Sequence, residues 1–248
     1  MSWTVVTGGS SGIGAAVAQL ARKAGDRVAV IDREAPGHSD YDEFVEFDLV
    51  DVADIKSAFA QRIASWEVGS LVHCAGIVRP SRLMDADPAD VSDAFAVNVR
   101  SLIELARLFV PGMADRHFGR IVAIGSRAAL GKPERTSYSA SKSALTGLVR
   151  TWGLELSPFG ITSNVVSPGP TNTRLFKANN DPEGWMLKSL RQRIPVGFVA
   201  EPVDIANVVH FLCSPAARFV TGQVLEVCGG TSIGWVEWDP KTMLARHT

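Results

Sequence analysis

The chain has 248 residues, of which 46% are hydrophobic and 21% charged, and its formal net charge is −1 at pH 7. These values are typical of a globular protein with a full hydrophobic core, and they exclude a partner bound mainly through charge, such as nucleic acid or an anionic membrane. No apolar run approaches the ~20 residues of a membrane span, and no leader pattern opens the chain. We therefore expect a cytoplasmic protein that binds neither nucleic acid nor membranes.

Short apolar runs alternate with longer amphipathic stretches, which is typical of a parallel sheet covered on both faces. The expected strands lie near 3–7, 27–32, 44–47, 69–73, 119–125, 161–167 and 223–227. The expected helices lie near 13–24, 52–65, 89–116, 138–157 and 202–213. No linker divides the chain. The sequence predicts one α/β domain over 1–248, with a Rossmann-type, doubly wound sheet of about seven parallel strands and helices on both faces.

Two connections depart from this alternation. Residues 34–43 join two strands expected to be parallel, but about ten residues barely accommodate a helical crossover, so we expect a loop. Residues 174–200 contain Pro and Gly on both sides of a short helical segment at 185–187. This region is expected to be a lid over the active site, with a surface helix as the alternative.

A glycine-rich turn follows the first expected strand and opens the first helix. Glycines let the backbone approach a pyrophosphate, and the helix N-terminus offers free N–H groups and a partial positive charge. The strand–turn–helix context makes this a predicted dinucleotide site. The residues expected to bind the cofactor here are Gly8, Ser10, Ser11, Gly12, Ile13 and Gly14.

Acidic residues close the second and third expected strands. Asp32 could accept hydrogen bonds from an adenosine ribose and would repel a 2′-phosphate, so the predicted cofactor is NAD. Arg33 beside it could instead pair with that phosphate, which keeps NADP as an alternative. Asp48, followed by Leu49, could meet the adenine amino group or cap the next helix.

Tyr138 and Lys142 lie four residues apart in an expected helix, and therefore on one face of it. A phenol, whose usual pKa is about 10, is a weak base at neutral pH, and a nearby ammonium favours its phenolate form. Ser126 follows an apolar strand, at the edge where open α/β sheets bind ligands. The pattern predicts proton transfer at an alcohol or ketone. No metal is expected, since Cys74, Cys213 and Cys228 match no zinc spacing and suit a reducing compartment.

Together these motifs resemble the short-chain dehydrogenase/reductase family over nearly the whole chain. The matching positions are Thr7-Gly8-x-x-x-Gly12-x-Gly14, Asn98, Ser126, Tyr138-x-x-x-Lys142, 167–173, and 220–223 before Gly229-Gly230. The resemblance implies that Tyr138 is the acid/base and that Lys142 lowers its pKa and holds the nicotinamide ribose. It implies that Ser126 orients the substrate oxygen and that Asn98 anchors a water relaying protons through Lys142.

The resemblance also implies further cofactor contacts. The nicotinamide carboxamide would meet Pro168, Gly169, Thr171 and Thr173, and the adenosine would meet Ala75 and Gly76. The chain departs from the family at His73-Cys74, where two Asn are usual, and at Cys228, which replaces an Asp. We expect His73, Cys74 and Cys228 to be core residues.

The segments expected around the substrate mouth carry several arginines: Arg79, Arg82, Arg127, Arg135, Arg174, Arg191 and Arg193. The predicted substrate-binding residues are Arg79, Ser126, Arg127 and Tyr138, which favour an anionic or cyclic alcohol, unless the arginines only solvate exposed loops. Within the family, the chain is similar to the cyclic dihydrodiol branch, such as 2,3-dihydro-2,3-dihydroxybenzoate dehydrogenase. An NADP(H)-dependent 3-oxoacyl-type reductase is an alternative. A non-catalytic dinucleotide-binding regulator is another, although such a protein should have lost part of the Asn–Ser–Tyr–Lys set that this chain keeps.

Two expected helices, 89–116 and 138–157, carry apolar residues on more than one face. We expect them to pair across a two-fold axis in a homotetramer or homodimer. The C-terminal extension, 231–248, contains Trp235 and Trp238. Its first part is expected to pack at a subunit contact or near the substrate mouth, with the surface of its own subunit as the alternative.

Overall fold

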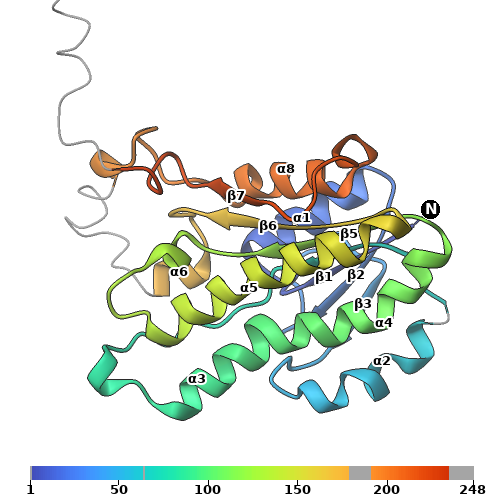
Figure 1. Ribbon diagram of the computed structural model, residues 1–248, viewed down its shortest axis with the longest axis horizontal. Helices are drawn as coiled ribbons and strands as arrows, with labels where there is room; N and C mark the ends of the chain where they lie inside the picture. The colour runs from blue at the N-terminus through green and yellow to red at the C-terminus, as the bar shows by residue number, and fades with distance from the viewer. Residues whose placement is uncertain (1, 64, 179–190, 235–248) are drawn as a thin grey trace, which may run out of the picture.

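A computed structural model describes residues 2–63, 65–178 and 191–234 of the chain. Seven strands form one sheet in the order β3-β2-β1-β4-β5-β6-β7, and every neighbouring pair is parallel. The strands are β1 (Trp3–Thr7), β2 (Arg27–Asp32), β3 (Glu43–Glu46), β4 (Val68–His73), β5 (Gly119–Ile124), β6 (Ile161–Pro168) and β7 (Val224–Val227). All seven expected strands are thus confirmed. Figure 1 shows them pointing toward the end of the molecule where α6 (Arg174–Ala178) lies.

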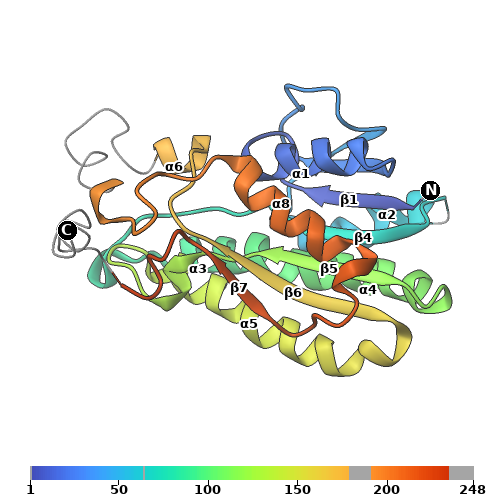
Figure 2. The same ribbon diagram turned by 90° about the horizontal axis from the view of Figure 1, so that it is seen from above.

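Helices cover both faces of this sheet, as Figure 2 shows. One core lies between the sheet and α1 (Gly12–Lys23) and α8 (Pro202–Cys213). The other lies beneath α2 (Ile55–Ile63), α4 (Ser101–Asp115) and α5 (Thr136–Glu155). The predicted doubly wound Rossmann-type fold is confirmed.

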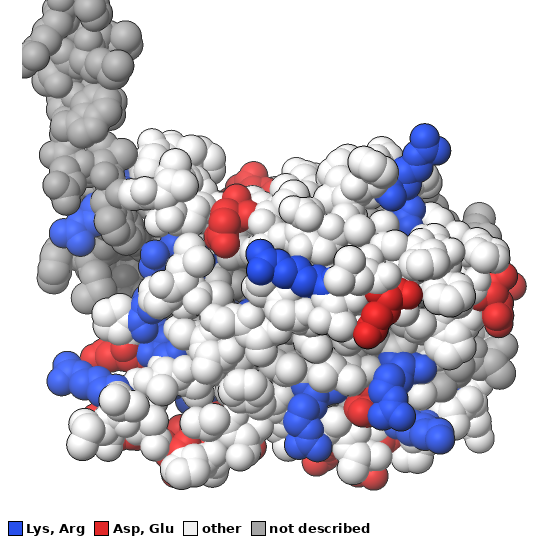
Figure 3. Space-filling view, in the orientation of Figure 1, with Lys and Arg blue, Asp and Glu red and all other residues white. Residues whose placement is uncertain are grey.

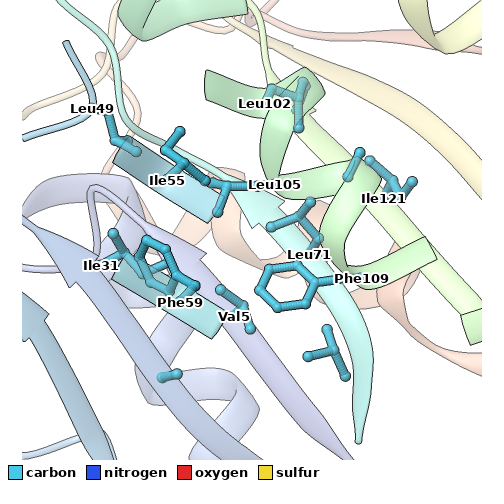
Figure 4. Close-up of a cluster of buried hydrophobic side chains, with 14 of the residues drawn as sticks. Val5, Ile31, Leu49, Ile55, Phe59, Leu71, Leu102, Leu105, Phe109 and Ile121 are labelled. Atoms are coloured by element: carbon cyan, nitrogen blue, oxygen red, sulfur yellow. The ribbon is translucent and has the colours of Figure 1, made fainter. Parts of the chain in front are cut away.

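The second core shows why the strands are apolar along their length. In Figure 4, Ile55 and Phe59 of α2 and Leu102 of α4 pack among side chains of the central strands. Phe59 and Leu102 are fully buried. Strands covered by helices on both faces bury both sets of side chains, which explains their continuous apolar runs.

The helix expected over 89–116 is not one uniform α-helix. It consists of α3 (Pro88–Phe95), a π-helical turn (Ala96–Arg100) and α4, with no break between them. A π-turn widens the helix locally, and such turns are frequent at functional sites. Here it contains Asn98. Residues 34–43 contain no helix, which confirms the expected loop.

The apolar residues expected on more than one face of the helices divide into two groups. Leu102, Leu105 and Phe109 of α4 and Leu145 and Val149 of α5 are at most 3% exposed and pack against the sheet, so they offer no surface to a second subunit. The others are only partly buried, and the pairing of these helices across a two-fold axis stays a prediction: Ile103, Leu108, Ala144, Leu148, Trp152 and Leu156. Leu154 of α5, at 82% exposure, is an apolar side chain that the chain leaves uncovered.

Two expectations lie outside the described residues: the helical segment at 185–187 and the positions of Trp235 and Trp238. Of the region 174–200, the structure describes α6 and residues 191–200. Among the described helices, none has the length and apolar character needed to cross a membrane.

Candidate active site

A cavity of about 840 Å³ lies at the carboxyl ends of the strands. It reaches from the glycine-rich turn after β1 to Ser126 after β5 and Tyr138 on α5. Of the predicted site residues, these line it: Gly8, Ser11, Gly12, Ile13, Gly14, Asp32, Arg33, Asp48, Leu49, Ala75, Gly76, Arg79, Ser126, Arg127, Tyr138, Lys142, Pro168, Gly169, Thr171 and Thr173. Ser10 and Asn98 are not among the lining residues, and Asn98 is fully buried. The fold therefore brings segments that are far apart in sequence to one cavity.

The glycine-rich turn has no room for side chains. Gly8 has φ +65°, and a Cβ there would lie 2.7 Å from the backbone nitrogen of Ala75. Gly12 has φ +56°, and a Cβ on Gly14 would collide with the carbonyl of Gly8. The turn thus presents bare backbone and the N-terminus of α1 to the cavity, which fits the pyrophosphate of a dinucleotide.

Asp32 ends β2 with its carboxylate at the edge of this turn. Its Oδ2 accepts a hydrogen bond from the backbone nitrogen of Ser10 (3.1 Å), and its Oδ1 accepts one from the nitrogen of Glu34 (3.3 Å). The Ser10 hydroxyl donates to the carbonyl oxygen of Glu34. Ser10 therefore ties the glycine turn to the loop after β2, and its contact with the cofactor stays a prediction.

Glu34 is a residue that sequence reasoning missed. Its carboxylate pairs with Arg174 of α6 at 2.7 Å and lies 3.9 Å from the Arg33 guanidinium. The hydrogen bond from Arg174, and then the positive charges of Arg174 and Arg33, lower the pKa of Glu34. Arg33 and Arg174 thus share one acidic partner. A separation of 140 residues between Glu34 and Arg174 explains why no local pattern revealed the pair.

His73 takes over hydrogen bonds at the end of β4, where the family usually has Asn. Its Nδ1 lies 2.8 Å from the Thr7 hydroxyl, and its Nε2 lies 3.0 Å from the carbonyl oxygen of Val97 in the π-turn. Burial, and secondarily the charge of Lys142, lowers the pKa of His73 to about 3. A neutral imidazole donates to Val97 and accepts from Thr7, whose oxygen accepts from the nitrogen of Ala75 (3.2 Å). His73 in place of the usual Asn therefore still holds, through Thr7, the backbone at Ala75 that lines the cavity.

His73 and Cys228 are buried, as expected for core residues. Cys74 is partly buried and packs against the core, and it also lines the cavity. Burial raises the pKa of the Cys74 thiol to about 12, so the thiol stays protonated and unreactive at neutral pH.

Asn98 joins two walls of the cavity from behind. Its Oδ1 accepts from the nitrogen of Ile77 (3.0 Å), and its Nδ2 donates to the Ser141 hydroxyl (2.9 Å). That hydroxyl donates in turn to the carbonyl of Tyr138 (3.0 Å). Asn98 thus links the segment after β4 to the turn of α5 that carries Tyr138. Its implied role in a water relay stays a prediction.

Lys142 is only 3% exposed and donates from Nζ to the carbonyl oxygen of Ile124 (2.7 Å). Burial lowers its pKa to about 8. Its nitrogen lies 5.9 Å from the centre of the Tyr138 ring. A Cβ on Gly76 would lie 3.1 Å from this nitrogen, so glycine is what lets the chain pass so close.

Tyr138 differs from the sequence expectation in its ionisation. Burial raises the pKa of Tyr138, while a hydrogen bond with Ser126 and the charge of Arg135 act in the opposite direction. The expected lowering was wrong for the chain alone, because loss of solvent at the phenol outweighs the favourable charges. Ser126 also caps the turn that follows it, accepting from the nitrogen of Ala128 (3.1 Å).

The remaining predicted cofactor residues are held by local hydrogen bonds. The Thr171 hydroxyl donates to the Gly169 carbonyl (3.0 Å), and the Thr173 oxygen accepts from the nitrogen of Phe176 at the start of α6 (3.1 Å). The Asp48 carboxylate accepts from the nitrogen of Val50 (3.1 Å). It therefore caps the turn after β3 and not the helix that follows.

Cations line the substrate end of the cavity. The cavity lining includes Arg79, Arg127 and Arg135, three of the arginines expected at the substrate mouth, and also Lys132, which was not expected there. Arg79 pairs with Asp90 at 3.4 Å. Figure 3 shows lysine and arginine side chains along the side of the molecule toward which the strands point in Figure 1.

Comparison with protein families identifies the family of this chain. Residues 8–232 match the family model described as enoyl-(acyl carrier protein) reductase. The chain belongs to the short-chain dehydrogenase/reductase family. It is accordingly an oxidoreductase that acts on an alcohol or carbonyl group of a small molecule with a nicotinamide dinucleotide.

Individual relatives in this family are similar over nearly their whole length. The 3-oxoacyl-[acyl-carrier-protein] reductase FabG of Escherichia coli K12 is 32% identical over 235 residues, covering 91% of this chain and 95% of the relative. The 2,3-dihydroxy-2,3-dihydro-p-cumate dehydrogenase of Pseudomonas putida is 30% identical over 246 residues, covering 92% and 93%.

Solved structures agree with this assignment. A short-chain dehydrogenase/reductase family protein superposes with a TM-score of 0.84 at 36% identity, covering 93% of this chain and 97% of the other. A Beutenbergia cavernae protein, described as an NAD(P)-dependent gluconate 5-dehydrogenase with NADP bound at low occupancy, has a TM-score of 0.86 at 31% identity. That match covers 92% of this chain and 96% of the other.

Proposed function

We propose that the chain is an NAD(H)-dependent oxidoreductase that interconverts a secondary alcohol and a ketone, with Tyr138 as acid/base. The observation that carries this proposal is the single cavity joining the glycine turn to Ser126, Tyr138 and Lys142. A bound nicotinamide would supply or accept the hydride. In the proposal, the Tyr138 hydroxyl gives a proton to the substrate oxygen during reduction and removes one during oxidation. Ser126 holds that oxygen by a second hydrogen bond.

Lys142 supports the proton transfer through its charge and its hydrogen bonds. With a pKa of about 8, the ammonium is mostly protonated at neutral pH. The ammonium group has three N–H donors and donates to one protein acceptor, the carbonyl of Ile124. The remaining donors could bind a ribose hydroxyl. Asn98 is a positioning residue in this proposal, because its contacts with Ile77 and Ser141 hold the two walls in register.

NAD is the proposed cofactor because of the charges around Asp32. The Asp32 carboxylate would accept from ribose hydroxyls and repel a 2′-phosphate. Arg33, the residue after Asp32, and Arg174 both face Glu34. A phosphate would have to compete with that carboxylate. The competing observation is the NADP described in the Beutenbergia cavernae structure. NADP(H) use is therefore the second candidate, with a 3-oxoacyl substrate of the kind in the name of the Escherichia coli relative.

The proposed chemistry is tested by Tyr138→Phe, assayed for NADH-dependent reduction of a panel of cyclic and acyclic ketones. Removal of the proton donor should lower kcat by at least about 10²-fold and leave NADH binding nearly unchanged. Tyr41→Phe is a matched control, because Tyr41 is the only other tyrosine and packs on Phe44 with a ring centroid distance of 6.4 Å. If Tyr138→Phe stays within a few-fold of the parent, the acid/base assignment is wrong.

The cofactor proposal is tested by comparing kcat/KM for NADH and NADPH in the parent, Asp32→Ala and Asp32→Asn. Both substitutions should weaken NADH use and improve NADPH use, since both remove the negative charge. Asp32→Asn keeps an acceptor for the nitrogen of Ser10 and so separates loss of charge from loss of loop structure. A parent that already uses NADPH more efficiently would contradict the role given to Asp32.

The substrate class and assembly belong to the same proposal. Both p-cumate dihydrodiol and gluconate, which the names of two similar proteins specify, carry a carboxylate. We propose a cyclic or anionic alcohol for this chain, held near Arg79 and Arg127. We also propose a homotetramer or homodimer, with Leu154 among the side chains that a second subunit covers. Light scattering that gives a monomer at micromolar concentration would contradict the assembly.

A further inference from the structure

Arg135 is a buried cation at the substrate end of the cavity. It is 7% exposed, precedes the first turn of α5 and lies three residues before Tyr138. A guanidinium has five N–H donors. Among the described residues, the Arg135 side chain makes one hydrogen bond, to the carbonyl oxygen of Glu134 (2.8 Å), and no ion pair. Burying a charge is costly unless it is paired, so this position favours an anionic ligand.

The backbone before Arg135 is held in an unusual conformation. Glu134 has φ +61°, the left-handed region that non-glycine residues rarely adopt. Its carbonyl accepts from the nitrogen of Ser81 (3.1 Å), and its carboxylate pairs with Arg82 (3.2 Å). These contacts pin the loop after β5 to the loop after β4. Because the Glu134 carboxylate pairs with Arg82, it does not pair with the neighbouring Arg135. Strained backbone of this kind clusters at ligand-binding positions.

Further cations gather beside Arg135. Lys132 and Arg127 line the same cavity, close to Ser126 and Tyr138. Desolvation of its ammonium group, and then the positive charges of Arg135 and Arg127, lower the pKa of Lys132. Like charges held together repel one another, and an anion between them would relieve that repulsion. Arg33, Arg79 and Arg174, elsewhere in the cavity, have acidic partners, whereas Arg135 and Lys132 make no ion pair with any described residue.

We propose that Arg135, supported by Lys132, binds a carboxylate of the substrate beside its reacting alcohol or ketone, so that the substrates are hydroxy acids and oxo acids. This inference rests on the proposed function. A planar guanidinium matches a carboxylate through two parallel hydrogen bonds, which fix direction as well as affinity. With the carboxylate on Arg135 and the reacting oxygen between Ser126 and Tyr138, the substrate is held at two points. Two-point attachment sets which face of the carbonyl is presented.

The test compares 3-oxocyclohexane-1-carboxylate with its methyl ester in NADH-dependent reduction. Both share the reacting ketone, so the ratio of their kcat/KM values cancels any effect of Arg135 on Tyr138 or the cofactor. The parent should prefer the acid by at least about tenfold, and Arg135→Met should lose most of that preference. Lys132→Met, at an exposed position where folding is not at risk, should lower the preference by about two- to fivefold. Arg107→Met, at an exposed residue of α4 paired with Glu104, is the matched control and should change nothing.

A second readout uses binding alone. In calorimetric titrations of the NADH-loaded protein, benzoate should bind at least about tenfold more tightly to the parent than to Arg135→Met, while benzamide should not distinguish them. Equal acid and ester turnover in the parent, or a benzoate affinity unaffected by Arg135→Met, overturns the carboxylate site and leaves the proposed function standing. Absence of all ketone turnover with intact, Arg135-dependent benzoate binding overturns the proposed function and supports the anion site.

Discussion

Lys142 is a buried lysine, and burial disfavours its charged form. The free energy of unfolding therefore depends on pH by an amount that follows from the pKa of Lys142. Burial lowers the pKa of Lys142 from 10.5 to about 8 in the folded chain. The unfolded chain therefore binds the proton more tightly than the folded chain, so stability rises as pH increases from about 8 toward 10.5. The full difference corresponds to about 3 kcal/mol, of which about 2.5 kcal/mol appears between pH 7 and pH 10.

Lys142→Met isolates this contribution, because methionine is similar in length and does not titrate. Urea unfolding of the cofactor-free parent and variant should be compared at intervals from pH 7 to pH 10. Other titrating groups cancel in the difference between the two proteins. Loss of the hydrogen bond to Ile124 changes the difference in the free energy of unfolding by the same amount at every pH. Deprotonation of the ammonium instead makes that difference change by about 2.5 kcal/mol in favour of the parent as pH rises from 7 to 10. A difference that stays constant within about 0.5 kcal/mol would refute a buried, destabilised ammonium.

Three further outcomes are expected. His73→Leu should lower the free energy of unfolding by about 2–4 kcal/mol, because the Val97 carbonyl and Thr7 hydroxyl lose their partner; chemical denaturation measures this, and an unchanged midpoint would contradict the network. Glu34→Gln should improve kcat/KM for NADPH relative to NADH several-fold by freeing Arg33 and Arg174, and an unchanged ratio would show that the pairing does not exclude phosphate. Gly8→Ala should abolish NADH binding in a fluorescence titration, since its Cβ would lie 2.7 Å from the Ala75 nitrogen, and near-parental affinity would contradict the close approach.

The sequence by itself determined the fold and which motifs lie together at one edge of the sheet. Strands covered on both faces must be apolar along their length, so the strands and the helices between them are visible as composition. Parallel strands end at one edge of the sheet, so motifs that follow β1, β2, β5 and β6 converge there whatever the details of packing. For this reason strand ends and spacing were enough to assign the glycine turn, Asp32, Ser126 and Tyr138 to one cavity.

Only the tertiary structure decided the charges and the neighbours. Whether the pKa of Tyr138 rises or falls depends on how much solvent the folded chain removes, which no spacing encodes. Glu34 pairs with Arg174, which lies 140 residues away in the sequence. His73 forms a hydrogen bond with the carbonyl of Val97 in the π-turn, which interrupts a helical pattern. Arg135 and Arg79 look alike as mouth arginines in the sequence, but one is buried without an acidic partner among the described residues and the other pairs with Asp90. Burial and pairing are properties of the assembled fold, because they depend on contacts between segments that the chain order does not juxtapose.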